Sequence, residues 1–199
     1  PDKTEAAEYV DELSPAAQII GAVNTIVNDD GRLTGYITDG EGFVHNLKDH
    51  GVDIKGKKIT VAGGGGAATA IQVQCALDGA REITIFNIKD AFFERTLQTA
   101  EKIRKAVPGI VVNVYDIADT AKMTEEITSS DIFANATIVG MKPMDDQSVV
   151  KDLSAFRPGL VVCDAVYNPA ETKLLREAKE AGCTCIGGKG MLLWQGVAA

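Results

Sequence analysis

Four consecutive glycines, Gly63 to Gly66, stand between a short apolar run and a helical pattern, and Ala67 and Ala68 follow them. Within this segment, Gly63, Gly65 and Ala68 have the spacing GxGxxA. In a strand, loop and helix unit, the first glycine permits a tight turn and the second lets the backbone approach a pyrophosphate. The small third residue lets the helix pack closely on the strand, and the helix N-terminus offers free N–H groups to the anion. The pattern predicts a loop that binds a dinucleotide, with a plain structural turn as the alternative.

A second group of polar residues, Asn87, Lys89 and Asp90, follows the next predicted strand. In folds of this kind the segment contacts the adenosine ribose, where a carboxylate accepts hydrogen bonds from the hydroxyls and repels a 2′-phosphate, and a cation does the reverse. Asp90 favours NAD, Lys89 is compatible with NADP, and Ile88 between them carries no charge. We therefore expect NAD, with NADP as the alternative. Asp90 is also a candidate helix cap.

The elements that position these residues alternate between short apolar strands and helices. Strands are predicted at 59–62, 82–87, 110–115, 131–134, 160–164 and 183–186, and helices at 39–49, 67–77, 92–106, 121–128 and 171–181. Two short helices within 4–20 and a hairpin over 22–36 precede them. Because right-handed crossovers join such strands, we expect an α/β fold with a doubly wound, Rossmann-type parallel sheet that is covered on both faces.

Composition excludes several function classes. A net charge of −8 over 199 residues argues against a nucleic-acid partner, which would need a clustered basic surface. No apolar run is long enough to cross a bilayer, so we expect no membrane partner. The four cysteines, at 75, 163, 183 and 185, are predicted to be free thiols, and no signal-peptide pattern is present, which favours the cytoplasm. No cluster of His, Cys and carboxylates has metal spacing, so a metal-free reaction is expected.

Short motifs on both sides of the predicted sheet resemble those of the shikimate dehydrogenase family. They are Gly21-Ala22-Val23-Asn24-Thr25, Thr38-Asp39-Gly40, Asn135-Ala136-Thr137 with Gly140-Met141, Tyr167-Asn168-Pro169, and Gly190-Met191-Leu192 with Gln195. They stand in family order, the resemblance covers essentially the whole chain, and residues 191–195 are most similar to the quinate/shikimate branch. The resemblance implies reversible hydride transfer between NAD(P) and the C3 alcohol or ketone of shikimate or quinate, in aromatic amino acid biosynthesis or quinate use. A methylene-tetrahydrofolate-type dehydrogenase and a non-catalytic dinucleotide-binding regulatory module are the alternatives.

The resemblance also implies roles for individual residues. Lys3 and Asp39 are the implied catalytic pair, because hydride transfer to a ketone leaves an alkoxide that needs a proton donor and a positive charge. Asn24 and Gln195 are the implied hydrogen-bond partners of substrate hydroxyls, and Tyr167 lines the same cleft, with a half-buried core tyrosine as the alternative. The implied cofactor-binding residues are Gly63, Gly64, Gly65, Gly66, Ala67, Asn87, Lys89, Asp90, Ala165, Asn168 and Gly188. Met191 is expected either near the nicotinamide or in the core.

Three isoleucines depart from the family pattern. Ile37 replaces an Asn before the catalytic Asp, Ile88 replaces a basic residue that suits NADP, and Ile138 replaces a Lys near the cofactor. Residues 1–40 are expected to be the end of a substrate-binding α/β lobe, 41–187 the NAD(P)-binding domain, and 188–199 the start of the segment that returns to that lobe. We expect a fragment that binds dinucleotide better than it turns over substrate. Its expected partner is a small-molecule substrate; a homodimer is one alternative for an oligomeric state that the sequence does not decide.

Overall fold

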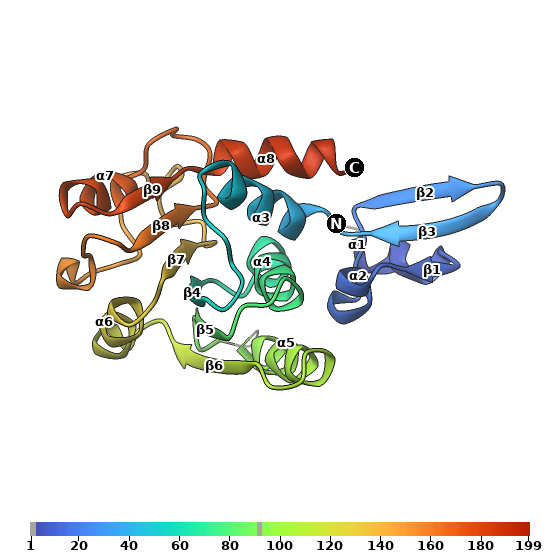
Figure 1. Ribbon diagram of the computed structural model, residues 1–199, viewed down its shortest axis with the longest axis horizontal. Coiled ribbons are helices and arrows are strands. Elements are labelled where there is room, and N and C mark those ends of the chain that lie inside the picture. Colours follow the sequence, from blue (N-terminus) through green and yellow to red (C-terminus); the bar gives the residue numbers. More distant parts are fainter. Residues whose placement is uncertain (1–2, 91–92) are drawn as a thin grey trace.

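A six-stranded parallel sheet forms the larger part of the molecule in the computed structural model, which describes residues 3–90 and 93–199 (Figure 1). Its strands, in the spatial order β6-β5-β4-β7-β8-β9, are β6 (Val111–Asp116), β5 (Glu82–Asn87), β4 (Lys58–Ala62), β7 (Ile132–Asn135), β8 (Val161–Asp164) and β9 (Thr184–Ile186). The order runs outward in both directions from β4, as in a doubly wound sheet. The predicted fold class is therefore confirmed.

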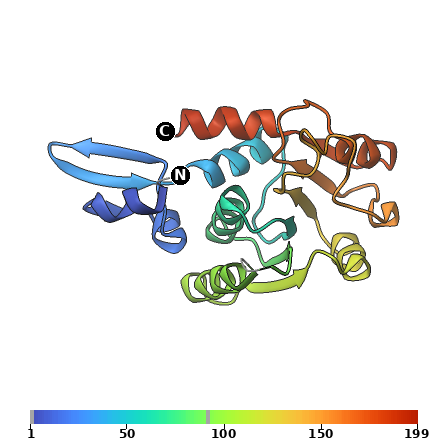
Figure 2. The ribbon, with the colours of Figure 1, turned by 180° about the vertical axis from the view of Figure 1, so that it is seen from behind.

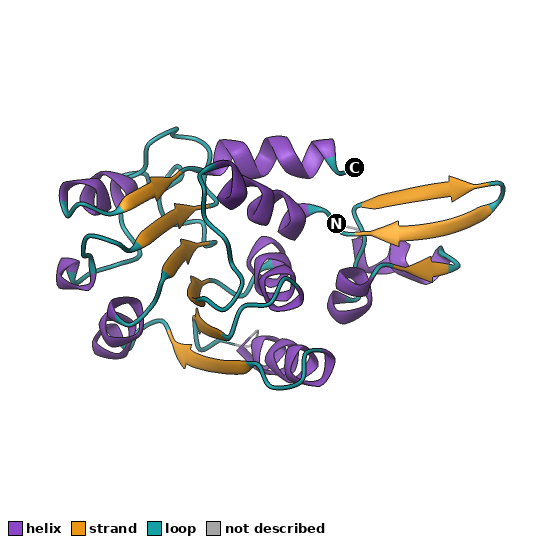
Figure 3. Cartoon of the chain, viewed as in Figure 1, coloured by secondary structure: helices purple, strands orange, loops and turns teal. Residues whose placement is uncertain are grey.

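Helices cover both faces of this sheet. α4 (Gly66–Leu77) and α5 (Phe93–Ala106) lie on one side, and α6 (Thr120–Thr128) and α7 (Lys173–Glu180) lie on the other (Figure 3). Alternate strand residues point to opposite faces, so Ile59 and Ile83 join one hydrophobic cluster while Phe86 and Phe133 join a second one. The sheet needs apolar side chains on both faces, which explains why its strands are mostly apolar in the sequence. The predicted first residue of α5, Phe92, and residues 1 and 2 lie outside the described part of the chain.

A smaller, three-stranded sheet precedes the large one. It comprises β1 (Glu12–Leu13), β2 (Thr25–Asp29) and β3 (Arg32–Tyr36), in the order β1-β3-β2, with α1 (Lys3–Ala6), the 3-10 helix η1 (Ala7–Tyr9) and α2 (Pro15–Ile20) beside it. β2 and β3 form the predicted hairpin, and the Asn28 side chain closes its turn by accepting a hydrogen bond from Gly31 N at 2.9 Å. The two short helices were predicted, whereas β1 was not.

α3 (Asp39–Asp49) connects the two sheets, and α8 (Gly188–Val197), which follows β9, lies beside it in both views (Figures 1 and 2). A Cβ atom on Gly42 of α3 would lie 2.6 Å from Met191 O and 2.7 Å from Gln195 N of α8. Glycine is therefore required where the backbones meet. Met191 is buried in the core between them, which decides between the two predicted settings of its side chain. No described helix is long and apolar enough to cross a membrane.

Candidate active site

The glycine loop follows β4, and steric contacts with the protein require glycine only at its first two residues. Gly63 has φ 122°, and a Cβ atom there would lie 2.7 Å from Ala136 O. A Cβ atom on Gly64 would lie 2.5 Å from the Nδ2 atom of Asn87. A Cβ atom on Gly65 or Gly66 would have no neighbour within 4 Å, so these two glycines face open space at the start of α4. The first two glycines thus fit the protein, and the next two leave room for a ligand.

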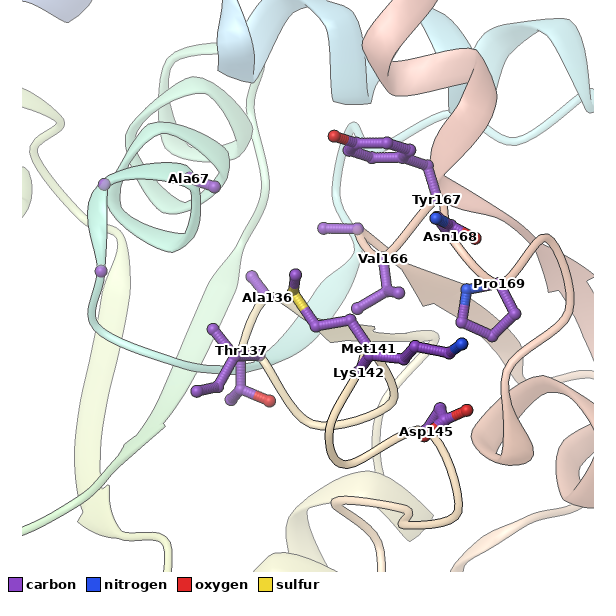
Figure 4. Close-up of a pocket in the computed structure, with 14 residues that line it drawn as sticks. Ala67, Ala136, Thr137, Met141, Lys142, Asp145, Val166, Tyr167, Asn168 and Pro169 are labelled. Carbon is purple, nitrogen blue, oxygen red and sulfur yellow. The ribbon is translucent and has the colours of Figure 1, made fainter.

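Two cavities adjoin this loop, and both are lined by Gly65, Ala136, Thr137 and Ile138. The first has a volume of about 470 Å³ and is also bounded by residues 165–169, with Tyr167 and Val166 across from Ala67 (Figure 4). The second has a volume of about 520 Å³ and extends along Asn87 and Ile88. Both volumes are typical of small-molecule sites. A helix N-terminus with open glycines between two cavities fits a dinucleotide, whose pyrophosphate lies between two nucleosides.

Most of the predicted cofactor residues line these cavities, but three do not. Gly63, Gly64, Gly65, Gly66, Ala67, Asn87, Ala165 and Asn168 are among the lining residues. Lys89 and Asp90 are exposed just beyond the second cavity, outside its described lining. Gly188 is buried, and a Cβ atom there would lie 2.5 Å from Ala165 O. It therefore supports the loop that lines the first cavity from behind.

Lys3 and Asp39 form an ion pair, with 2.9 Å between the Lys3 Nζ atom and an Asp39 carboxylate oxygen. The Lys3 segment is held in place because Lys3 O accepts a hydrogen bond from Val23 N at 2.8 Å. Asp39 is the first residue of α3, where the helix dipole favours a carboxylate. The Lys3 side chain is 50% exposed and that of Asp39 is 21% exposed, so both groups remain accessible.

The predicted substrate residues Asn24 and Gln195 each lie beside a neighbour of Asp39: Asn24 contacts Thr38, and Gln195 lies beside Gly42. The Asn24 amide donates to Thr38 Oγ1 at 3.1 Å and accepts from Thr38 N at 3.0 Å, so it fixes the residue before Asp39. Gln195 N lies beside Gly42, which follows Asp39 by three residues and therefore shares a side of α3 with it. Tyr167 is 52% exposed and lines the first cavity, so it is not a core residue.

The two histidines, His45 and His50, do not line these cavities. His45 is exposed and stacks on Trp194 with 5.1 Å between ring centroids, and Trp194 also donates a hydrogen bond to Asp49. These contacts join α3 to α8 on the side that faces solvent. The four cysteines are free, and burial raises the pKa of the Cys75 and Cys163 thiols. Within residues 3–90 and 93–199, no group of three His, Cys, Asp or Glu side chains is arranged to hold a metal.

One functional candidate was missed in the sequence, the buried carboxylate of Asp164 at the end of β8. It is 2% exposed, and it accepts hydrogen bonds from Asn135 Nδ2 at 3.0 Å, Val166 N at 3.0 Å and Thr172 Oγ1 at 2.6 Å. Burial raises the pKa of Asp164 to about 6, although the three hydrogen bonds act in the opposite direction. An acidic residue that ends an apolar strand was the available signal.

The isoleucines that depart from the family pattern have two different settings. Ile37 is buried in the core, so it packs against apolar neighbours where the family pattern has a polar Asn. Ile88 and Ile138 are 60% and 65% exposed and line the cavities. Two positions near the candidate cofactor site therefore present an apolar side chain where the family pattern has a cation.

The doubly wound sheet, the open glycine loop and the nearby lysine and aspartate pair define a dinucleotide-dependent oxidoreductase. The chain is 52% identical, over 196 residues, to a quinate/shikimate dehydrogenase of Escherichia coli O139:H28 (strain E24377A / ETEC), covering 98% of this chain and 68% of that protein. The solved structure of Listeria monocytogenes shikimate 5-dehydrogenase in complex with shikimate and NAD is 50% identical with a TM-score of 0.97, covering 100% of this chain and 68% of that one. Shikimate 5-dehydrogenase from Thermus thermophilus in complex with NADP(H) and shikimate is 32% identical with a TM-score of 0.78, again over 100% and 68% of the two chains. No family model matches the chain.

The chain belongs to the quinate/shikimate dehydrogenase family, which comprises NAD(P)-dependent oxidoreductases. It spans about two thirds of the length of the relatives that it matches. The predicted family, enzyme class and nicotinamide cofactor are confirmed. The folate-dehydrogenase and non-catalytic alternatives are set aside, because the relatives at 52% and 50% identity are a quinate/shikimate dehydrogenase and a shikimate 5-dehydrogenase.

Proposed function

We propose that this chain uses NAD to oxidise the C3 hydroxyl of shikimate or quinate, and reduces the corresponding ketone in reverse, with Lys3 and Asp39 as the catalytic pair. The observation that carries the proposal is their 2.9 Å ion pair at the start of α3, beside α8. The first residue of α8, Gly188, abuts the loop that lines the first cavity, and Gln195 lies seven residues further on. At 1.5 Å per residue, the two points are about 10 Å apart. This separation suits a nicotinamide ring and a cyclic substrate that meet between them.

The proton transfers follow from the pair itself. The dinucleotide, when bound, accepts or supplies the hydride. In the reducing direction, the Lys3 ammonium donates a proton to the alkoxide oxygen as the new C–H bond forms, and its charge stabilises that oxygen beforehand. In the oxidising direction, the same nitrogen, once neutral, removes the hydroxyl proton. Asp39 holds the lysine side chain in position through their ion pair.

We assign the two cavities to the two halves of the dinucleotide. The cavity along Asn87 and Ile88 follows β5, the strand whose end contacts the adenosine ribose in folds of this type. The cavity bounded by residues 165–169 then takes the nicotinamide. The absence of a cation at Ile88 supports NAD over NADP, because a 2′-phosphate would gain no charged partner from this side chain.

We propose that Asn24, Gln195 and Tyr167 contact the hydroxyls of the substrate. Asn24 uses one amide hydrogen and its oxygen on Thr38, which leaves a second N–H for a ligand. Gln195 donates to Leu192 O at 3.3 Å, a contact within its own helix that a substrate can replace. In the proposed division into residues 1–40, 41–187 and 188–199, each segment contributes one of these three residues. The cytoplasmic location and the homodimer stay predictions, to be tested by cell fractionation and by molar mass in solution.

A spectrophotometric assay tests the proposal. The protein that carries this chain is supplied with shikimate or quinate, each with NAD or NADP, and the absorbance of reduced cofactor is followed. We expect NAD reduction with at least one of the two substrates, and slower reduction of NADP. Failure of all four combinations, in protein that is folded by circular dichroism, would contradict it.

A further inference from the structure

The first cavity is bounded by two loops from different strands. The loop after β7 contributes residues 136–138, 141, 142 and 145, and the loop after β8 contributes residues 165–169. The strands are neighbours, so the two loops leave the same edge of the sheet. A dinucleotide held between them depends on the spacing of these two walls.

A buried side-chain hydrogen bond joins the two loops at their roots, beside the backbone bond from Ala165 N to Asn135 O at 2.8 Å. Asn135, the last residue of β7, donates from Nδ2 to Asp164 Oδ1, the last residue of β8, at 3.0 Å. The two side chains are 1% and 2% exposed. Within the part of the chain that the structure describes, neither residue lines the cavity. They therefore act on it through other residues.

Each partner also fixes its own loop. The Asn135 amide donates to Val139 O at 3.0 Å and accepts from Thr137 N at 3.1 Å and from Thr137 Oγ1 at 2.7 Å. These bonds fold the first loop back over the strand end. Two backbone groups of the loop, Thr137 N and Val139 O, are thus bonded by one side chain, so Asn135 fixes the first turn of that loop.

Asp164 does the same for the second loop. Its Oδ1 accepts from Val166 N at 3.0 Å, and its Oδ2 accepts from Thr172 Oγ1 at 2.6 Å. Thr172 is fully buried and caps α7 by accepting from Leu175 N at 3.4 Å. The carboxylate thus ties both ends of the 165–172 segment to the end of β8. A Cβ atom on Gly140 of the first loop would lie 3.4 Å from the Thr172 side chain, so the loops also approach each other there.

We infer that Asn135 and Asp164 are positioning residues for the nicotinamide half of the cofactor, because together they set the distance between the two loops that would enclose it. The inference rests on the proposed assignment of the two cavities. The cavity along Asn87 is also lined by residues 136–139 of the first loop, but not by residues 165–169 of the second. Its glycine-loop wall is held separately, since Gly63 N is bonded to Phe86 O and Asn87 to Thr96. Loss of the bond is therefore expected to change the nicotinamide half of the site more than the adenosine half.

Binding measurements on purified chain separate the two halves. NAD and ADP-ribose, which lacks the nicotinamide ring, are titrated by calorimetry into the wild type, Asp164→Ala and Asn135→Ala. We expect each variant to bind NAD about tenfold more weakly and to lose less affinity for ADP-ribose, because the bond between the loops is broken in both variants and the loop after β8 lines only the nicotinamide cavity. Asn135→Ala gives an independent answer where Asp164→Ala does not fold in thermal unfolding.

Two further variants distinguish positioning from general loss of stability. Asp164→Asn keeps an acceptor for Asn135 and Val166, and its amide can donate to Thr172, so it is expected to retain wild-type NAD affinity. Thr60→Val removes another fully buried hydroxyl, which is bonded to Ser130 within 2.8 Å and lies outside both cavities, and is expected to bind both ligands normally.

The positioning role would be overturned, and the proposed function left intact, if the two alanine variants lost affinity for NAD and ADP-ribose equally, or lost affinity for neither ligand. Wild-type chain that binds neither ligand would overturn the cavity assignment and the positioning role together.

Discussion

The Lys3 ammonium lies 2.9 Å from the Asp39 carboxylate, although 36 positions of the chain separate the two residues. The pair is formed because Lys3 O is bonded to Val23 N, two residues before β2, and Asp39 begins α3 just after β3, so the two ends of the hairpin hold both residues. Half of the Lys3 side chain is exposed, and exposed ion pairs contribute less than about 1 kcal/mol to folding. We therefore expect the ion pair to serve catalysis and to add little to the free energy of unfolding.

Removal of the Asn24 amide is expected to disturb Asp39 without direct contact. Asn24→Ala releases both hydrogen bonds to Thr38, the residue before Asp39, so we expect turnover to fall about tenfold, with NAD affinity unchanged. Steady-state kinetics and calorimetry measure the two effects. Asn28→Ala, at the other end of the same strand, removes a turn hydrogen bond and is the matched control. Equal turnover in the two variants would remove Asn24 from the site.

A methyl group on Gly65 is expected to affect the ligand and not the fold. A Cβ atom there has no neighbour within 4 Å, so Gly65→Ala retains the wild-type unfolding temperature and weakens NAD binding at least about tenfold by occupying space beside the pyrophosphate. Gly64→Ala is expected to lower both the unfolding temperature and the affinity for NAD, because its Cβ would lie 2.5 Å from Asn87 and Thr96 side-chain atoms. Thermal unfolding and calorimetry distinguish them. Unchanged NAD affinity in Gly65→Ala would place the pyrophosphate elsewhere.

A cation at position 88 is expected to change the preference between the two cofactors. Ile88→Arg places a guanidinium at the edge of the proposed adenosine cavity, where it can pair with a 2′-phosphate, so the ratio of NADP to NAD affinity is expected to rise about tenfold. Ile26→Arg, on exposed β2 of the other sheet, has the same change of charge and is expected to leave the ratio unchanged. An unchanged ratio in both variants would contradict the assignment of this cavity.

The raised pKa of Asp164 predicts a pH dependence of stability with a definite sign. The folded protein binds this proton more tightly than the unfolded chain does, since the pKa is about 6 against an ordinary 3.8. The stabilising contribution of the protonated form is fully present below about pH 4 and is lost as the pH rises through about 6. Wild type is therefore expected to lose stability relative to Asp164→Asn between about pH 4 and 7, by on the order of 3 kcal/mol.

Denaturant unfolding of the two proteins at several pH values measures that difference. A constant difference across this pH range would show that Asp164 titrates in the folded protein as it does in the unfolded chain.

The large sheet was predictable because its central strands β4 and β7 are buried along their whole length, and its strands are mostly apolar in the sequence. The glycine loop was predictable because its spacing has a direct geometric cause. β1 was not predicted, because its two residues are extended only through pairing with Thr34 and Gly35, and that pairing is not visible locally. The helical state of α8 was also missed; glycines interrupt its start, and packing against α3 stabilises it.

Residue types alone predicted only part of the candidate site. The pairing of Lys3 with Asp39 was suggested by family resemblance alone, since a lysine in an exposed segment is ordinarily a solvated charge. Asp164 was missed because its importance comes from burial and from three partners, two of which lie on other segments. Lys89, Asp90 and Gly188 were assigned by position along the chain, and the structure places them just outside the cavities.

The most direct test of the account replaces Lys3 with Met in the protein that carries this chain and compares turnover of shikimate or quinate with calorimetric affinity for NAD. Lys48→Met, on the exposed side of α3, is the control. We predict that Lys3→Met loses at least about 100-fold in kcat, as expected for removal of a general acid and base, while it binds NAD as tightly as wild type. Turnover within a few-fold of the Lys48→Met control, at unchanged NAD affinity, would contradict the catalytic role of the Lys3 and Asp39 pair.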